Sequence, residues 1–110
     1  MINILFNHVC VLMLVLICSS SWAIVPLTKK QQILLSINCV QCHASNLSGA
    51  PVIGKPNDWK KIIKQGEDGI LRNIVYGING MPPLGYCSAC NESDFRAIIR
   101  VMTGGFGDVK

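Results

Sequence analysis

Residues Cys39-Val40-Gln41-Cys42-His43 read CVQCH, which is a CxxCH motif. Where a helix ends on such a motif, positions i, i+3 and i+4 lie on one face, so both thiols and the imidazole point the same way. The two thiols can then add to the vinyl groups of one haem while the histidine reaches its iron. The motif therefore predicts covalent attachment of a c-type haem.

The first 23 residues predict a secretory signal peptide. They contain no Lys, Arg, Asp or Glu, and an apolar run at 9–18 (VCVLMLVLIC) is followed by small residues up to Ala23. A bilayer span needs about 20 apolar residues, so this run is too short for one. Cleavage after Ala23 is expected, with an uncleaved N-terminal anchor as the alternative. The remaining residues, 24–110, are expected to form one domain.

Removal of that leader leaves four cysteines in two CxxC pairs, at positions 39, 42, 87 and 90. In an oxidising compartment these pairs allow three interpretations: haem attachment by the first pair, a zinc site with four cysteine ligands, or thiol–disulfide exchange. Exported thiols tend to become disulfides, which disfavours zinc. No alternating strand pattern suggests the βαβ scaffold typical of exchange proteins. Haem attachment is the favoured interpretation.

The hydrophobic periodicity predicts a small all-α domain of four short helices and no strands. The predicted helices run from Thr28 to the CxxCH motif, from Pro56 to Gly66, from Asp68 to Gly77 and from Asn91 to Gly104. The residues expected to face inward are, in the same order of helices, Ile33, Leu34 and Ile37; Trp59, Ile62 and Ile63; Ile70, Leu71, Ile74 and Val75; and Phe95, Ile98, Ile99 and Met102. These faces are few for a stable core, so the helices are expected to close around the haem.

The sixth iron ligand is sought among two methionines, because His43 is the one histidine left after the leader. Met102 is in phase with the apolar face of the last helix, which favours core packing. Met81 precedes Pro82 and Pro83, which stiffen the loop around its sulfur, so Met81 is the predicted ligand. Histidine–methionine ligation favours electron transfer over catalysis. The alternative is a haem peroxidase or gas sensor in which the Met81 bond is labile.

These motifs resemble those of the class I cytochromes c, and most of all the short bacterial group related to cytochrome c-5. The likeness covers nearly the whole chain after the leader and rests on CVQCH, GAPVIG (49–54), Trp59, GINGMPPLG (77–85) and CSAC (87–90). The resemblance implies thioethers at Cys39 and Cys42, His43 and Met81 as iron ligands, a Pro51 carbonyl that orients the imidazole, Trp59 at the haem edge near the propionates, and a Cys87–Cys90 disulfide.

The distribution of lysines indicates what kind of partner this protein would bind. The net charge of +4 belongs to the residues after the leader, where Lys55, Lys60, Lys61 and Lys64 cluster and Lys29-Lys30 form a pair. These lysines are either a solvated helix face or a basic rim that steers docking onto acidic redox partners, such as a terminal oxidase. No nucleic-acid partner is expected. The expectation is a periplasmic one-electron carrier of a respiratory chain, bound to a membrane only if the leader is retained.

Overall fold

The computed structural model describes residues 25–105, and the predicted signal peptide lies outside them. Regular structure in this range is helical, as predicted, and the β-type pairing within it is one isolated bridge between Ile78 and Met81. In chain order the elements are α2 (Lys29–Leu34), the π-helix η1 (Leu35–Cys39), α3 (Val40–His43), η2 (Asn46–Ser48), α4 (Pro56–Trp59), η3 (Ile63–Gln65), α5 (Gly66–Tyr76), η4 (Pro83–Tyr86) and α6 (Glu92–Thr103).

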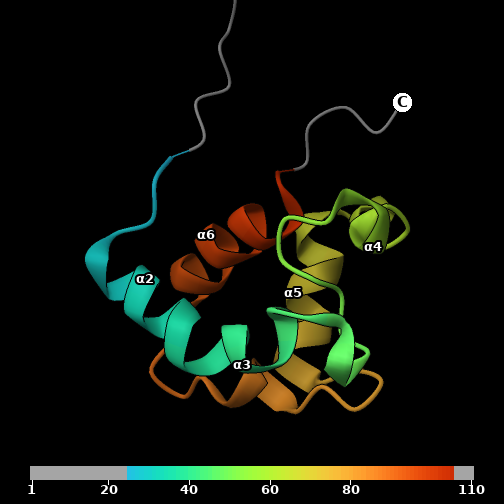
Figure 1. The fold of residues 1–110 in the computed structure, drawn as a ribbon. Helices are drawn as coiled ribbons and strands as arrows, with labels where there is room; N and C mark the ends of the chain where they lie inside the picture. Colours follow the sequence, from blue (N-terminus) through green and yellow to red (C-terminus); the bar gives the residue numbers. More distant parts are fainter. Residues whose placement is uncertain (1–24, 106–110) are drawn as a thin grey trace, which may run out of the picture.

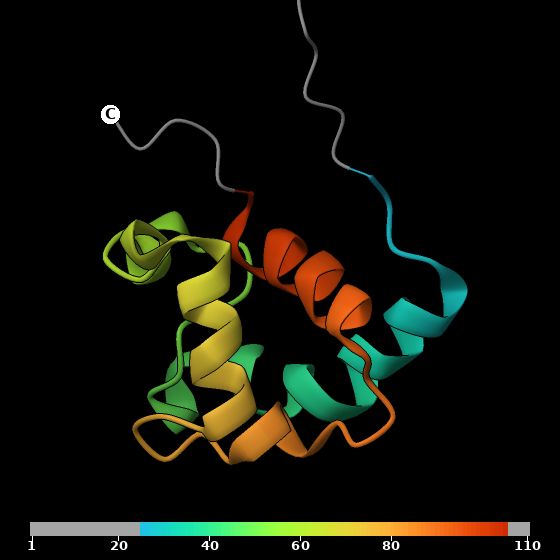
Figure 2. The same ribbon diagram turned by 180° about the vertical axis from the view of Figure 1, so that it is seen from behind.

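Helices α2, α5 and α6 enclose the core (Figure 1). Figure 2 shows the same arrangement from behind: α6 lies between α2 and α5, and α4 and the segment after α5 lie at opposite ends of α5. Helix α6 supplies half of the buried apolar side chains in the described range, because its four predicted core residues are all buried: Phe95, Ile98, Ile99 and Met102. None of the helices in residues 25–105 has the length and apolar character that crossing a membrane requires.

Two capping boxes begin the first and last helices, at the residues where the sequence predicted that these helices start. Thr28 accepts the N–H of Gln31 (3.2 Å), and the Gln31 side chain accepts the N–H of Thr28 (3.0 Å). Asn91 and Asp94 exchange the same two bonds at the start of α6, at 2.9 and 3.1 Å. Each box satisfies two backbone donors that a helix start leaves without intrahelical partners.

The second box also joins two helices. Lys30 Nζ lies 2.6 Å from Asp94 Oδ2, so the carboxylate that caps α6 pairs with a lysine of α2. Hydrogen bonding from Lys30, and then from the Asn91 N–H, lowers the pKa of Asp94. The crossing of α2 and α6 therefore depends on an ionised carboxylate.

The predicted first helix is continuous from Lys29 to His43, but it changes its winding at η1. The wider π turn rotates the residues after Leu34 relative to an α-helix. Leu34 is buried as predicted, and Leu35 and Cys39 pack against the core cluster to which Leu34 belongs. The prediction that Ile33 and Ile37 face inward is wrong, since both are about half exposed.

The middle of the chain also departs from the prediction. The second helix is interrupted: α4 ends at Trp59, and a separate 3-10 turn, η3, follows. Trp59 is buried, and Ile62 and Ile63 pack against the core. Helix α5 begins at Gly66, two residues before its predicted start, and Val75 near its end is exposed rather than inward.

A charge network that the sequence analysis missed joins α5 to α6. Arg100 holds Glu67 with two hydrogen bonds, of 2.8 and 2.9 Å, and Arg96 donates to the same carboxylate at 2.9 Å. Burial opposes ionisation of Glu67, but the bonds from both arginines outweigh it and lower its pKa. Two arginines four residues apart on α6 thus anchor the first turn of α5.

Candidate haem-binding site

The CxxCH motif lies on the last turns of the first helix, as its spacing predicted. Cys39 ends η1 and is partly buried, Cys42 in α3 is exposed, and both are free thiols. Burial raises the pKa of the Cys39 thiol, so it stays protonated at neutral pH. A reactive exchange cysteine has a lowered pKa instead, which argues against thiol–disulfide exchange at Cys39.

The imidazole of His43 is buried and held in one orientation. Its Nδ1 lies 2.7 Å from the carbonyl oxygen of Pro51. A carbonyl only accepts hydrogen bonds, so Nδ1 carries the proton and Nε2 keeps the lone pair that a metal requires. The structure therefore brings together the two residues that the sequence analysis expected to form the ligand and its orienting group.

Backbone hydrogen bonds fasten the loop that carries Pro51. The N–H of Ile53 donates to the carbonyl of His43 itself (2.9 Å), and the N–H of Gly54 donates to the carbonyl of Met102 (3.3 Å). The loop is thus tied to α3 on one side and to α6 on the other. It cannot move away from His43 without breaking contacts to two helices.

Trp59 contacts both His43 and this loop. Its ring lies 5.9 Å from the imidazole, centroid to centroid, at an interplanar angle of 21°. Its indole N–H donates to the carbonyl of Val52 at 2.7 Å. The indole therefore packs beside the predicted iron ligand while its donor binds the loop. Its expected position near the haem propionates stays a prediction.

Met81 closes a tight turn of the backbone. Ile78 and Met81 exchange two backbone hydrogen bonds, of 2.8 and 3.2 Å, across Asn79 and Gly80. Both turn residues have positive φ, 51° and 88°, the pattern of a type I′ turn, which Asn-Gly favours. This turn fixes the backbone on the N-terminal side of Met81, and Pro82 and Pro83 restrict it on the other side. The other methionine, Met102, lies in the core as predicted.

Gly77 fixes the approach of α5 to this turn. Its φ is +80°, and a Cβ at this position would lie 2.7 Å from the Met81 carbonyl oxygen and 3.1 Å from the nitrogen of Pro83. A side chain here would collide with backbone atoms that cannot move aside. The glycine is therefore required for the chain to double back from α5 onto the Met81 turn.

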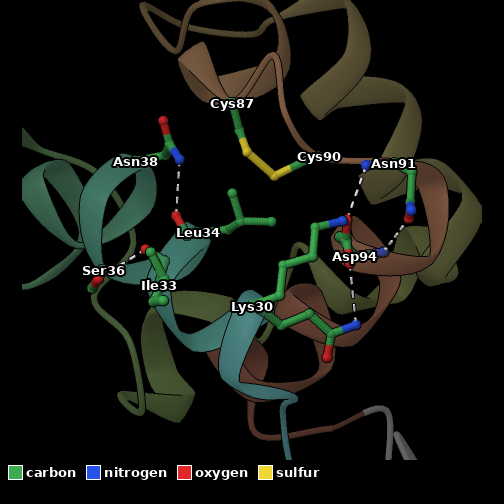
Figure 3. Close-up of a disulfide and its surroundings, with 10 residues drawn as sticks. Lys30, Ile33, Leu34, Ser36, Asn38, Cys87, Cys90, Asn91 and Asp94 are labelled. Atoms are coloured by element: carbon green, nitrogen blue, oxygen red, sulfur yellow. Dashed lines mark hydrogen bonds and ion pairs between the residues drawn. A yellow bond between two sulfur atoms is a disulfide. The ribbon is translucent and has the colours of Figure 1, made fainter.

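Cys87 and Cys90 form a disulfide next to the core (Figure 3). Cys87 is almost fully buried, and Leu34 of α2 belongs to the same apolar cluster. The bond takes two of the four thiols that a zinc site with four cysteine ligands would need. Within residues 25–105, moreover, no group of three or more His, Cys, Asp or Glu side chains is arranged to hold a metal ion.

The residues present fit a haem c. Attachment needs two free thiols three positions apart, and the iron needs an imidazole whose other nitrogen is engaged in a hydrogen bond. Cys39, Cys42 and His43 meet both requirements on consecutive turns of one helix. A helical domain built around such a helix is a c-type cytochrome with one haem.

Comparisons with known proteins agree with this class. The family model described as cytochrome C oxidase, cbb3-type, subunit III matches residues 27–101. Cytochrome c5 of Ectopseudomonas mendocina is 38% identical over 73 residues, which are 64% of this chain and 84% of the relative. Cytochrome c5 of Azotobacter vinelandii is 38% identical over 68 residues, 60% of this chain and 82% of the relative.

A solved structure is similar as well. It is the cytochrome c in a crystal structure of an electron-transfer complex of nitrite reductase with cytochrome c. The match has a TM-score of 0.63 at 33% identity and covers 72% of this chain and 96% of the other. The present chain belongs to the class I monohaem cytochromes c, in the cytochrome c5 group. It is an electron-transfer protein with covalently bound haem c.

Proposed function

We propose that this cytochrome is exported to the periplasm by residues 1–23 and carries single electrons between redox proteins of a respiratory chain. Haem c supplies an iron that changes between the ferric and ferrous states. Cys39 and Cys42 would form the thioether bonds to the haem, and His43 and Met81 would bind its iron. The observation that carries the proposal is the buried imidazole of His43, whose bond to Pro51 leaves Nε2 for the iron.

The chain serves this role by keeping both ligands in place. The Pro51 loop is tied to α3 and α6, so His43 has one ring orientation. The type I′ turn and the two prolines restrict the backbone on both sides of Met81. Ligands held in this way move little when the charge on the metal changes, and a small rearrangement suits repeated electron transfer.

The test is the purified protein from a host that attaches c-type haem. We expect a Soret band, a c-type pyridine haemochrome spectrum and an intact mass equal to residues 24–110 plus one haem, less two hydrogens for the disulfide. A colourless preparation with stoichiometric zinc would overturn the proposal. A full-length mass with haem present would overturn only the cleavage of the leader.

The Met81 assignment has its own matched pair of variants. Met81→Ala is expected to lower the reduction potential and let carbon monoxide bind the reduced protein, because it opens the sixth position. Met102→Ala is expected to destabilise the fold by about 2–5 kcal/mol while the iron keeps its ligand. If Met102→Ala opened the sixth position and Met81→Ala did not, the assignment would be wrong.

The partners we propose are redox proteins with acidic docking surfaces. In the similar complex the redox partner is nitrite reductase. Each acidic side chain between residues 25 and 105 lies in an ion pair, so the negative charges of this part of the chain are neutralised internally. Lys60, Lys61 and Lys64 are exposed, and none of the ion pairs in this range involves them. This lysine surface therefore supplies uncompensated positive charge beside α4.

Salt dependence tests that surface. The association rate with an acidic redox partner is expected to fall as ionic strength rises, because screening weakens steering between separated charges. A Lys60→Gln, Lys61→Gln, Lys64→Gln variant should associate more slowly and with a weaker salt dependence. Lys29→Gln, which removes one exposed lysine at the start of α2, is the control. Equal salt dependence in the triple variant and the wild type would contradict the docking role.

A further inference from the structure

One peptide group lies between His43 and a carboxylate that the sequence analysis did not single out. The carbonyl of Pro51 accepts the Nδ1 proton of His43 (2.7 Å). The N–H of Val52, which belongs to the same peptide group, donates to Oδ2 of Asp58 (3.0 Å). The imidazole of His43 and the carboxylate of Asp58 are therefore hydrogen-bonded to the C=O and the N–H of one peptide group.

This peptide group is held firmly in its orientation. The next carbonyl, that of Val52, accepts from the indole N–H of Trp59 (2.7 Å) and from the backbone N–H of Lys55 (3.1 Å). The next N–H, that of Ile53, donates to the carbonyl of His43. Rotation of the Pro51–Val52 peptide would break bonds on both sides, so Asp58 and His43 stay aligned through it.

The arrangement has an electronic consequence. A carboxylate that accepts from an amide N–H polarises the amide, and chained hydrogen bonds strengthen one another by about 10–30% per bond. The Pro51 carbonyl then becomes a stronger acceptor for the Nδ1 proton. Where a carboxylate bonds a metal-ligating histidine directly, the ligand becomes more basic. Here the same influence passes through one peptide group.

We propose that Asp58 is a positioning residue for the axial histidine: through the Pro51–Val52 peptide, its carboxylate strengthens the Nδ1 hydrogen bond and raises the basicity of His43. A more basic imidazole favours the ferric state, so Asp58 lowers the reduction potential. Lys55, whose Nζ lies 3.9 Å from Oδ1 of Asp58, partly offsets the charge without occupying Oδ2. The inference rests on the proposed role of His43 as an iron ligand.

Three variants of the haem-loaded mature protein test the relay. Asp58→Asn keeps an oxygen acceptor but removes the charge, and Asp58→Ala removes both. Asp68→Asn is the matched control, because it removes one carboxylate from an exposed residue of α5 with the same change in net charge. The measurements are the reduction potential, the resonance of the His43 Nδ1 proton in the reduced protein, and hydrogen exchange of the Val52 amide.

We expect the potential to rise in Asp58→Asn and to rise further in Asp58→Ala. The Nδ1 proton should move upfield in both, as its hydrogen bond weakens. The Val52 amide should exchange at least roughly tenfold faster in Asp58→Ala, which deprives it of its acceptor. Asp68→Asn should leave the Nδ1 resonance and the Val52 amide unchanged and shift the potential less.

Two results would overturn the relay. One is an unchanged Nδ1 resonance in Asp58→Asn with a potential shift equal to that of Asp68→Asn, which would make Asp58 a distant charge only. The other is an unchanged Val52 amide in Asp58→Ala. If Asp58→Ala fails to fold, Asp58→Asn carries the test by itself. Spectra of the wild type in which His43 is not bound to iron would instead overturn the proposed function.

Discussion

The loop at 51–54 and the segment at 77–90 each fix one proposed iron ligand, but they do so by different means. Hydrogen bonds from three helices hold the loop beside His43: its carbonyl and N–H groups meet partners in α3, α4 and α6. The segment around Met81 is held in place instead by its backbone conformation and by a covalent bond. Positive φ angles occur there at Gly77, Asn79, Gly80, Leu84, Gly85 and Tyr86, and the Cys87–Cys90 disulfide closes the segment.

The difference lies in where strain is stored. Leu84 and Tyr86 have φ angles of 60° and 62°, and a left-handed conformation costs a non-glycine residue roughly 1–2 kcal/mol. Such strain persists only when the surroundings enforce it. Here two backbone hydrogen bonds enforce it: the Pro82 carbonyl accepts from the N–H of Gly85, and the Leu84 carbonyl accepts from the N–H of Cys87. Cys87 is itself fixed by its disulfide to Cys90. The methionine side is therefore expected to open before the histidine side.

Among variants that separate the two sides, the largest effect is expected from Gly77→Ala, which affects the methionine side alone. The new Cβ would meet two backbone atoms at 3.1 Å or less, and φ is +80°, so we expect a loss of about 2–4 kcal/mol of unfolding free energy. The charge-transfer band of methionine-ligated ferric iron should weaken. Guanidinium unfolding and the absorption spectrum measure the two effects.

Gly80→Ala is the control for that variant. Its φ is +88°, but a Cβ there would have no atom within 4 Å, so only the conformational cost remains, about 1 kcal/mol. Equal losses in the two variants would show that the close approach of Gly77 to the Met81 turn is unimportant.

Removal of the disulfide is expected to have the next largest effect. Cys87→Ala with Cys90→Ala should cost roughly 2 kcal/mol by the loop-entropy relation for so short a loop. With the strained segment released, carbon monoxide should bind the reduced protein more readily. Hydrogen exchange of the Ile53 amide, which donates to His43, should stay unchanged. Faster exchange at Ile53 would show that the two sides are coupled and not independent.

Acid is expected to destabilise the histidine side and the methionine side together, because protonation of Asp94 weakens the crossing of α2 and α6. The folded pKa of Asp94 lies below the ordinary value of about 3.9. Its contribution to stability is therefore complete above that value and is lost as the pH falls through the folded pKa. Because Lys30 is more than half exposed, we expect a smaller effect than that of the disulfide.

Unfolding measured from neutral to acid pH checks this expectation with Asp94→Asn. The variant should be less stable than the wild type at neutral pH, and the gap should close as the pH falls. A gap that stays constant over the whole range would contradict the role of the ionised carboxylate.

The smallest effect is expected from relief of strain at Tyr86. Its side chain is 81% exposed, so Tyr86→Gly loses little packing and removes the cost of a positive φ. The gain is offset in part by the greater chain entropy of glycine, which leaves at most about 1 kcal/mol of stabilisation. Val25→Gly, at an exposed residue before α2, is the comparison. A clear destabilisation by Tyr86→Gly would mean that the segment is not strained there.

The sequence predicted local features well and distant ones poorly. The helix starts at Thr28 and Asn91, the core face of α6 and the CxxCH helix each follow from residues a few positions apart. The exposure of Ile37 could not be predicted, because it lies in a π turn that changes the helical period on which the prediction depends. The break after Trp59 was not predicted either: Trp59, Ile62 and Ile63 all contact the core, but they do so from two separate elements.

The haem-binding site divides in the same way, into features that the sequence determines and contacts that only the tertiary structure creates. The thiols and the imidazole are determined by residue type and spacing, since the chemistry of haem attachment requires those groups in one helical turn. The two candidate methionines are determined by residue type alone. The contacts of Asp58, Glu67 and Trp59 arise only in the tertiary structure. Each joins residues whose relation depends on how a loop or a second helix returns to the first, and no periodicity in the chain encodes such an encounter.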